Sequence, residues 1–581
     1  MFCDPIHRPP LRRIFFAKKA AVPEVTQKII NLITQIRIVM SQQPYTKVAS
    51  YEGKKGEVHR VVLLYSGGLD TSVMLKWIQD EYNAEVIALT IDINQQVDDL
   101  EEIKQKALDL GAIKAIVVDA KNEFAYHYIA KGIKANASYQ GKYHLSTPLG
   151  RPLLSKIAVE IAREHGADTI AHGCTGKGND QVRIEGCVLT LAPEMKIIAP
   201  VREWSMGRDE EIAYAKKHKI PVKQTVDIPY SWDDNMWGVT GESGEIENPA
   251  LIPPLDKILQ VCNVVEKTPD KPEYVSIKFV KGIPVAVDDT SMRLVELIQH
   301  LNEIGGKHGV GVTHHIEDRL VGLKVRGLYE APAAEIIINA HFNLEKYVCT
   351  RQENEFKSLV DSKWAYLCYG GLWYEPLMDD LNAFIDTIND KVSGLVTVKL
   401  FKGQAEVVAV ETPNTIFDEK LATFMKSDSF NQNASAGFTE IYSLQMRLAQ
   451  EKERFALVSI GDQKDKDDFL PILRDLDSLG FKFFATTGTH DFLSKHSISS
   501  IPVQKMNSDR NPNLEEIMRK NILDLIVDIP YSKPPKGMLE DRAIIREWAI
   551  KNEVTRIHDL DTAKQLIHKM KKRMVVRAKK S

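Results

Sequence analysis

The sequence lacks paired cysteines, long apolar runs and an excess of charge of either sign. Its 6 cysteines are scattered and none forms a C-x-x-C pair, so neither a zinc site nor a disulfide framework is indicated, and a cytoplasmic location is expected. No run of about 18 apolar residues occurs, so we expect no membrane partner. The formal net charge of −3 and the pI near 6.6 show no basic bias, so we expect no nucleic-acid partner.

The first 39 residues are rich in basic side chains and poor in acidic ones. The basic side chains include Arg8, Arg12, Arg13, Lys18 and Lys19. Two interpretations stay open, a targeting segment or an upstream start with Met40 as the real beginning, and the second is favoured. We expect residues 1–59 to form an N-terminal extension that is disordered or absent from the native protein.

At 581 residues the chain is too long for one hydrophobic core. Residues 60–222 alternate short apolar runs with amphipathic stretches, which predicts a parallel sheet covered by helices on both faces. The predicted strands are residues 61–65, 86–91, 115–118, 169–171 and 197–199, and the predicted helices are residues 98–109, 152–164 and 209–217. Gly111 and Gly166 stand where helices should end.

The pattern changes after Pro221 to that of antiparallel hairpins. One hairpin is predicted at residues 274–280 and 283–287, and another at residues 395–401 and 405–410, each around a Lys-Gly turn. Residues 223–447 are therefore predicted to be a second, α+β domain, followed by a charged linker at 448–454 and a third, α/β domain at 455–575. The fold class is thus multidomain, α/β and α+β.

Residues 66–72 (SGGLDTS) follow the first predicted strand and begin the first predicted helix. Gly67 and Gly68 let the backbone approach a phosphate, and the helix start offers unpaired N–H groups. The loop also carries the hydroxyl groups of Ser66, Thr71 and Ser72. A bare carboxylate would repel phosphate, so we expect Asp70 to orient the loop or to hold Mg²⁺. The loop resembles the pyrophosphate loop of enzymes that cleave ATP between its α and β phosphates.

Residues 172–183 (HGCTGKGNDQVR) form a second glycine-rich loop after a predicted strand. Asp180 and Arg183 are three residues apart and should share a helix face, where they could meet the ammonium and carboxylate groups of an amino acid. The alternative is an ordinary surface ion pair. Both loops lie at carboxyl ends of predicted strands, where open α/β sheets bind ligands.

Five segments resemble the argininosuccinate synthase family in order and spacing. They are residues 66–72, 143–152, 172–183, 231–241 and 309–329. The resemblance covers about residues 60–447. It implies a Rossmann-like adenine-nucleotide α-hydrolase domain followed by a synthetase domain, with ATP and Mg²⁺ as cofactors, citrulline and aspartate as substrates, and a homotetramer.

The resemblance also assigns site residues by position. The ATP positions are Leu64, Tyr65, Ser66, Gly67, Gly68, Leu69, Asp70, Thr71 and Ser72, with Ile91 near the adenine and Gly173 also on the nucleotide. The aspartate positions are Thr175, Asn179 and Asp180, and the citrulline positions are Tyr143, Asn179, Arg183, Ser231, Thr240, Glu317 and Tyr329. A further citrulline hydroxyl position holds Pro148, for which Thr147 could substitute. Asp70, Asp180 and Arg183 are taken as the catalytic residues, with Asp70 also on the metal.

The implied reaction needs no enzyme nucleophile. The ureido oxygen of citrulline attacks the α-phosphorus of ATP, pyrophosphate leaves, and the amine of aspartate then displaces AMP from citrullyl-AMP. One alternative is another pyrophosphate-loop ligase, but a tRNA thiolase should show paired catalytic cysteines and an amidotransferase should show a glutaminase domain. A catalytically inactive metabolite sensor is the other alternative, and the intact loops argue against it.

Residues 455–575 resemble the regulatory domain that ends the large subunit of carbamoyl phosphate synthetase and is related to methylglyoxal synthase. The resemblance places phosphate-binding positions at Lys466, Thr486, Thr489 and Lys505. Agreement stops at Asp528 and Pro530, so the identity of the ligand and the sign of its effect stay open. We expect a receptor for an anionic effector and not a second catalyst.

Overall fold

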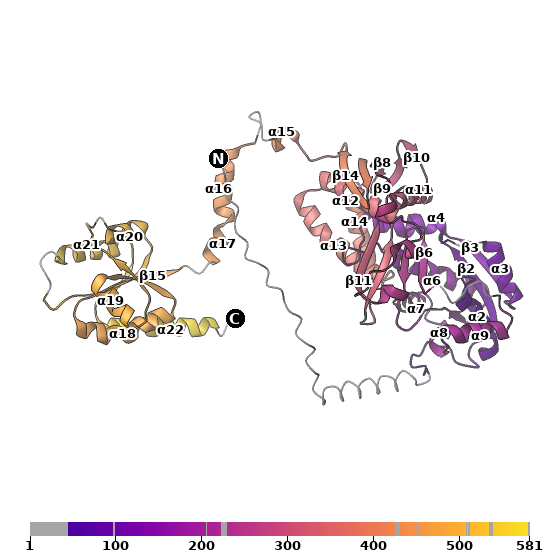
Figure 1. Cartoon of the computed structure of the whole chain (residues 1–581), viewed down its shortest axis with the longest axis horizontal. Coiled ribbons are helices and arrows are strands. Elements are labelled where there is room, and N and C mark those ends of the chain that lie inside the picture. Colours follow the sequence, from indigo (N-terminus) through magenta and orange to yellow (C-terminus); the bar gives the residue numbers. More distant parts are fainter. Residues whose placement is uncertain are drawn as a thin grey trace. The chain divides into compact units, whose positions relative to one another are not determined.

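The computed structural model describes residues 45–578 apart from 97–98, 205, 222–228, 424–429, 450–452, 507, 509, 511 and 534–537. The chain divides into two compact units, residues 1–428 and 429–581, and each is described by itself (Figure 1). Among the described residues, no helix is both long and apolar enough to cross a membrane.

A five-stranded parallel sheet begins the first unit, with strand order β3-β2-β1-β4-β5. Its strands are β1 (Arg60–Leu64), β2 (Glu85–Asp92), β3 (Lys114–Asp119), β4 (Thr169–Ala171) and β5 (Lys196–Ile198), which confirms the five predicted strands. Its helices are α2 (Leu69–Tyr82), α3 (Leu100–Asp109), α4 (Lys121–Glu123), α5 (Ala130–Lys134), α6 (Ser146–Glu164), α7 (Asp180–Leu191), α8 (Pro200–Glu203) and α9 (Arg208–Lys217), with a π-helical turn at Phe124–Ile129. The order reverses between β1 and β4, so the loops after these strands flank one crevice.

Apolar side chains along β1 point alternately to the two faces of this sheet, which explains why helices cover both faces. Val61 and Leu63 pack in one apolar cluster with the buried side of α2, while Val62 packs in another with the buried side of α6. Helix α6 starts six residues before the predicted helix at 152–164, because Pro148 occupies its first turn, where the missing N–H costs no hydrogen bond. Gly111 and Gly166 have φ of +92° and +60° just past helix ends, as expected of terminating glycines.

In place of the disordered extension predicted up to residue 59, residues 45–59 pack against this sheet. Glu52 forms a parallel bridge with Ile197 of β5, and Val58 is buried in the apolar cluster beneath α2. The segment has no helical or strand periodicity, so its sequence carried no signal for this packing. The prediction for residues 1–44 lies outside the described residues.

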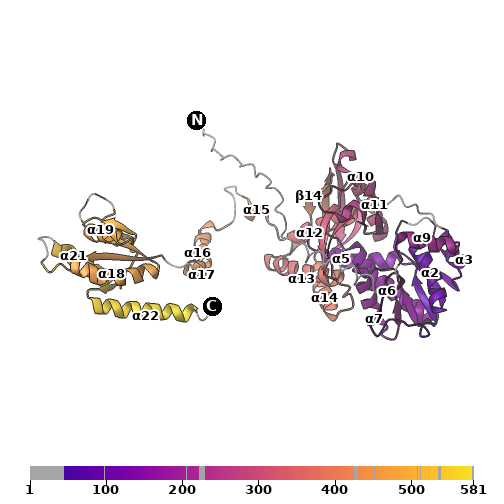
Figure 2. The ribbon, with the colours of Figure 1, turned by 60° about the horizontal axis from the view of Figure 1, so that its bottom comes forward.

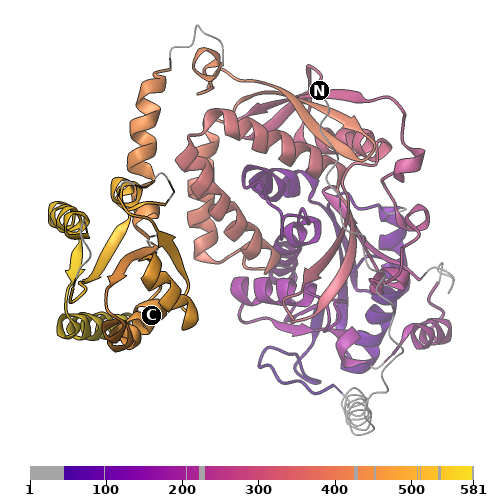
Figure 3. The same cartoon turned by 60° about the vertical axis from the view of Figure 1, so that its left-hand side comes forward.

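The rest of the first unit is built on two antiparallel sheets with strand orders β10-β9-β8-β13-β14 and β11-β12-β7-β6. The strands are β6 (Ser231–Asn235), β7 (Gly238–Glu242), β8 (Glu273–Val280), β9 (Ile283–Val287), β10 (Thr290–Ser291), β11 (Val312–Asp318), β12 (Lys324–Glu330), β13 (Gly394–Phe401) and β14 (Gln404–Glu411). Both predicted hairpins are confirmed as β8–β9 and β13–β14. The helices are α10 (Leu255–Ile258), α11 (Leu294–Lys307), α12 (Pro332–Val348), α13 (Arg351–Tyr369), α14 (Pro376–Asn389) and α15 (Glu419–Ala422). Helix α12 packs across β13 and β14, as Figure 3 shows.

The second unit begins with helices α16 (Gln432–Tyr442) and α17 (Leu444–Ala449) and continues with a parallel sheet of order β17-β16-β15-β18-β19. The strands are β15 (Arg454–Ile460), β16 (Phe481–Thr486), β17 (Ser500–Val503), β18 (Leu523–Ile529) and β19 (Thr555–Ile557). The helices are α18 (Gln463–Ser478), α19 (Thr487–Lys495), α20 (Leu514–Lys520), α21 (Met538–Lys551) and α22 (Leu560–Ala578). Helices α18 and α22 lie side by side on one face (Figure 2). Of the predicted linker at 448–454, residues 450–452 lie outside the described residues, while residues 448–449 end α17 and Arg454 begins β15.

Candidate active site

The loop after β1 leaves the start of α2 available to an anion. Gly67 has a φ of +78°, and a Cβ there would lie 2.8 Å from Ile103 Cγ1, so no other residue fits without strain. Lys106 Nζ donates to the Gly67 carbonyl at 2.8 Å and fixes the turn. Gly68 is the N-cap of α2 and has no side-chain cap, so the first N–H groups of the helix have no capping acceptor from it.

The side chains of this loop divide into two groups. Ser66 is exposed, and its Oγ lies 3.2 Å from Thr71 Oγ1, so these two hydroxyls are available near the helix start. Ser72 is buried, donates to the Gly68 carbonyl at 2.7 Å and lies 3.1 Å from the Tyr65 hydroxyl, so both brace the helix. The Asp70 side chain is exposed beside them.

A metal ion at this loop would need the phosphates of a bound nucleotide as ligands. Among the residues that the structure describes, no three His, Cys, Asp or Glu side chains gather as metal ligands. Mg²⁺ is commonly held by one or two carboxylates together with substrate phosphates, so the Asp70 carboxylate in the first turn of α2 fits that arrangement.

The glycine-rich loop after β4 lies against the same helix. A Cβ on Gly173 would approach Met74 Cε of α2 to 2.7 Å, so the backbone here passes close to α2. The loop is held internally, since Gln181 Nε2 donates to the Gly176 carbonyl at 2.7 Å and Gly178 N donates to the Thr175 carbonyl at 3.2 Å. The two glycine loops are therefore neighbours at the crevice where the strand order reverses.

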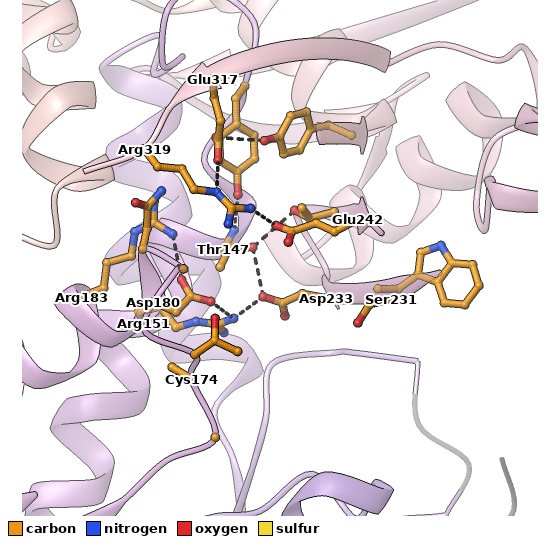
Figure 4. Close-up of a pocket in the computed structure, with 18 residues that line it drawn as sticks. Thr147, Arg151, Cys174, Asp180, Arg183, Ser231, Asp233, Glu242, Glu317 and Arg319 are labelled. Carbon is orange, nitrogen blue, oxygen red and sulfur yellow. Dashed lines mark hydrogen bonds and ion pairs between the residues drawn. The ribbon is translucent and has the colours of Figure 1, made fainter. Parts of the chain in front are cut away.

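A cavity of about 330 Å³ lies where this loop, α6 and α7 face the sheet β11-β12-β7-β6 (Figure 4). It is lined by all ten predicted substrate positions and by Gly173. These ten are Tyr143, Thr147, Thr175, Asn179, Asp180, Arg183, Ser231, Thr240, Glu317 and Tyr329. The predicted ATP positions 64–72 and Ile91 do not line it, and they belong to β1, β2 and the loop after β1. The Ile91 side chain packs in the core.

Asp180 is the centre of a charged cluster at one end of the cavity. Arg183 Nη1 donates to one of its oxygens at 2.8 Å and Arg151 Nη2 to the other at 2.9 Å, so Asp180 and Arg183 do share a helix face. Arg151 also pairs with Asp233. Burial acts to raise the pKa of Asp180, but the two guanidinium charges outweigh it and lower that pKa to about 2. The carboxylate is therefore charged at any physiological pH.

Arg183 is held so that part of its guanidinium faces the cavity. Its Nε donates to the Tyr369 carbonyl at 2.8 Å, and its guanidinium lies 4.8 Å from the centre of the Tyr369 ring. The Tyr369 hydroxyl also accepts from Asn179 Nδ2 at 2.7 Å. Arg183 Nη2 is buried without a hydrogen-bond partner in the described part of the chain. A buried N–H of this kind is costly unless a ligand accepts from it, which suits a substrate carboxylate.

The other end of the cavity carries a carboxylate and two stacked tyrosines. The rings of Tyr143 and Tyr329 stack with centres 4.2 Å apart, and the Tyr329 hydroxyl donates to Glu317 at 2.9 Å. Burial, and then the charge of Glu317, raise the pKa of Tyr329 well above its ordinary value, so the hydroxyl remains a donor. Thr147 places its hydroxyl in the cavity next to Pro148, 3.2 Å from Asp233 and 3.4 Å from Thr240.

Seven further lining residues were not among the predicted site residues. They are Arg151, Cys174, Gly178, Trp232, Asp233, Glu242 and Arg319. All but Glu242 stand within the five segments on which the resemblance was based, so their positions carried a signal although no role had been assigned to them. Burial raises the pKa of the Cys174 thiol, so it is not an activated nucleophile.

The second unit brings three of its four predicted effector positions together. Lys466 Nζ donates to the Gly488 carbonyl at 2.9 Å, and the hydroxyls of Thr486 and Thr489 lie 3.2 Å apart at the start of α19. Lys505 is exposed two residues beyond Val503, the partner of Thr486 in the sheet. One residue that departs from the resemblance, Asp528, is buried and pairs with Arg542 and Arg556.

A helix start open to an anion lies at the crevice of a parallel sheet, next to a cavity of paired charges without an activated nucleophile. This arrangement suits an ATP-dependent ligase. Comparison with known families agrees with this class. The model of the arginosuccinate synthase N-terminal HUP domain matches residues 60–221, and that of the arginosuccinate synthase C-terminal domain matches residues 230–449. The chain belongs to the argininosuccinate synthase family, and an MGS-like domain matches residues 468–557 beyond the family region. The predicted resemblance is thus confirmed for both parts of the chain.

Individual relatives are similar over the same region. The chain is 52% identical over 390 residues to the argininosuccinate synthase of Pyrococcus furiosus, an alignment that covers 67% of this chain and 94% of that protein. It is 50% identical over 385 residues to that of Oceanobacillus iheyensis, covering 66% and 92%. It is 48% identical over 385 residues to that of Staphylococcus carnosus, covering 66% and 95%.

Proposed function

We propose that the first unit joins citrulline to aspartate at the expense of ATP, giving argininosuccinate, AMP and pyrophosphate. The observation that carries this proposal is the single cavity on which all ten substrate positions converge, next to the uncapped start of α2. The names of the relatives support the same reaction.

Four charged groups of the cavity have parts in this reaction. Arg183 and Glu317 hold the carboxylate and the ammonium of citrulline, and Asp180 holds the ammonium of aspartate. Arg151 is a cation beside Asp180 and suits a carboxylate of aspartate. The backbone N–H groups after Gly68, with Ser66 and Thr71, hold the departing pyrophosphate. Mg²⁺ held by the phosphates and Asp70 would neutralise charge on that leaving group. Catalysis is then positioning and electrostatic stabilisation.

The reaction is tested by its products and by its dependence on each substrate. With ATP and Mg²⁺, the purified chain should release pyrophosphate only when citrulline is present, and should release AMP and form argininosuccinate only when aspartate is also added. ADP and orthophosphate as products would contradict the proposal.

We further propose that the second unit is a receptor for an anionic metabolite. The support is local: Lys466, Thr486 and Thr489 meet at the start of α19, where N–H groups and hydroxyls favour an anion. Thermal unfolding of the whole chain with inorganic phosphate or nucleoside monophosphates tests this. A rise in the unfolding temperature of the second unit with one of these ligands supports the proposal. If none of them changes the unfolding temperature, the proposal is contradicted.

A further inference from the structure

We infer that residues 45–58 form a strap that holds the glycine-rich loop in place, with Tyr51 as its positioning residue. The strap precedes the family match at residues 60–221, so the comparisons assign nothing to it. The inference rests on the proposed function, because its effect is read in the use of aspartate. A chain of hydrogen bonds runs from the strap to the cavity.

The first step fixes the strap on the sheet. Gly53 N donates to the Ile197 carbonyl at 3.0 Å, and Ile197 N donates to the Tyr51 carbonyl at 3.0 Å, so the strap continues the sheet beside β5. Lys47 Nζ adds an ion pair to Glu203 at 3.1 Å. With its backbone held on both sides, Tyr51 has a defined direction, and its hydroxyl donates to Glu185 Oε2 at 2.6 Å.

The second step passes through Glu185 to His172. Glu185 is only 5% exposed, and its other oxygen lies 3.1 Å from His172 Nε2 and 2.7 Å from Arg202 Nη1. His172 Nδ1 accepts from Cys174 N at 3.2 Å, so the proton of a neutral ring is on Nε2 and is donated to Glu185. Glu185 therefore sets the tautomer that lets His172 hold the backbone of Cys174.

The third step reaches the cavity. Cys174 and Thr175 line it, and Thr175 is a predicted aspartate position. A second branch runs from Arg202 to Gln181 Oε1 at 2.8 Å and from Gln181 Nε2 to the Gly176 carbonyl at 2.7 Å. The two branches fix the backbone on both sides of Thr175, and both start at Glu185 or its partner Arg202. The hydroxyl of Tyr51 joins the strap to both branches by its hydrogen bond to Glu185.

A purely structural strap would stabilise the fold without favouring one substrate. A positioning strap should act on the aspartate end alone, because its bonds end at Cys174 and Gly176 and none of them reaches Glu317 or Tyr329. The two substrates are separable in the reaction, since pyrophosphate release needs citrulline and not aspartate. Tyr51→Phe in the full chain is the direct variant, because it removes one hydroxyl and leaves the ring.

Tyr51→Phe should raise the aspartate KM about three- to tenfold while single-turnover release of pyrophosphate with ATP and citrulline stays unchanged. The matched control is Tyr214→Phe, which removes a hydroxyl that donates to Asp80 at 3.2 Å on α2, away from the loop, and should change neither quantity. An unchanged aspartate KM in Tyr51→Phe, or an equal loss in both half-reactions, would overturn the inference. If the unaltered chain releases no pyrophosphate with citrulline, the proposed function fails first, so the two failures are distinguishable.

Discussion

At the scale of single residues, the cavity depends on carboxylates whose charges are set by their neighbours. Asp180 lies between Arg151 and Arg183, and the two cations lower its pKa to about 2 in spite of its burial. A carboxylate that stays charged can bind an ammonium group. Asp180→Asn should therefore raise the aspartate KM, with a loss of about 10²–10³-fold in kcat/KM from one charge-assisted contact.

Initial rates at varied aspartate measure this, and Lys177→Ala is the control. Lys177 is exposed in the same loop and contributes its carbonyl to Arg319, so removing its side chain should leave aspartate use unchanged. Near-normal kinetics in Asp180→Asn would show that this helix face does not bind aspartate.

A second carboxylate, that of Asp361, lies remote from the cavity and should make the stability of the fold depend on pH. Lys357 is buried between Glu345 at 2.9 Å and Asp361 at 2.8 Å, so one ammonium faces two carboxylates. Burial raises the pKa of Asp361 from 3.8 to about 7, although Lys357 opposes the shift. The folded state then binds a proton more tightly than the unfolded state, so stability should fall as the pH rises from about 4 to about 7 and change little above that.

Asp361→Asn removes the titrating group and should flatten that slope. Urea unfolding at several pH values between 5 and 8 measures the free energy of unfolding in the parent and the variant. Parallel pH curves for the two proteins would mean that Asp361 is already charged in the folded state throughout this range.

At the scale of elements, the turn between β11 and β12 joins the two ends of the cavity. Arg319 donates to Glu242 at 2.8 Å, to Glu317 at 3.4 Å and to the Lys177 carbonyl at 3.3 Å, so one side chain links three elements. Leu320 N adds a bond to Asn179 Oδ1 at 2.9 Å. The turn therefore orients both Glu317, the carboxylate predicted for citrulline, and the glycine-rich loop predicted for aspartate.

Arg319→Met should raise the KM of both substrates, in contrast to Asp180→Asn, which should affect aspartate. The expected loss is about tenfold for each, because the variant removes neighbours and no direct ligand contact. Lys324→Ala is the control, since its exposed ion pair with Asp318 lies on the same hairpin outside the cavity. A change in only one KM, measured at saturating concentrations of the other substrates, would show that the turn does not act on both ends.

The elements also show which parts of the structure had a local signal in the sequence. The first sheet was predictable because its strands are short apolar runs between amphipathic helices, and both hairpins because Lys-Gly turns separate alternating runs. The resemblance supplied the positions that line the cavity. The pairing of Arg151 with Asp180 and Asp233 had no local signal, because it joins residues 29 and 82 positions apart. The strap at 45–58 was missed for the same reason, since the bonds that hold it on the sheet, such as Gly53 to Ile197 and Tyr51 to Glu185, join residues far apart in the chain.

At the scale of the whole molecule, the family region and the MGS-like domain are separate matches, at residues 60–449 and 468–557. A chain that ends at residue 449 keeps every residue of the cavity and should retain ligase activity. It should lose any response to the effector of the second unit. Coupling between effector binding to the second unit and substrate binding to the first would change the apparent substrate affinity about 5- to 150-fold, or about 1–3 kcal/mol.

Lys505→Ala in the full chain separates effector binding from catalysis. Lys505 follows β17 at the carboxyl edge of the second unit's sheet, two residues beyond the partner of Thr486, so the variant should weaken the effector and leave activity without effector unchanged. Lys482→Ala is the matched control, because this exposed lysine lies at the opposite edge of the sheet, where it pairs with Glu453. The measurement is ligase activity against effector concentration for both variants. Equal weakening in both would indicate a general effect of charge, and loss of activity in the shortened chain would indicate that the second unit is structural and not regulatory.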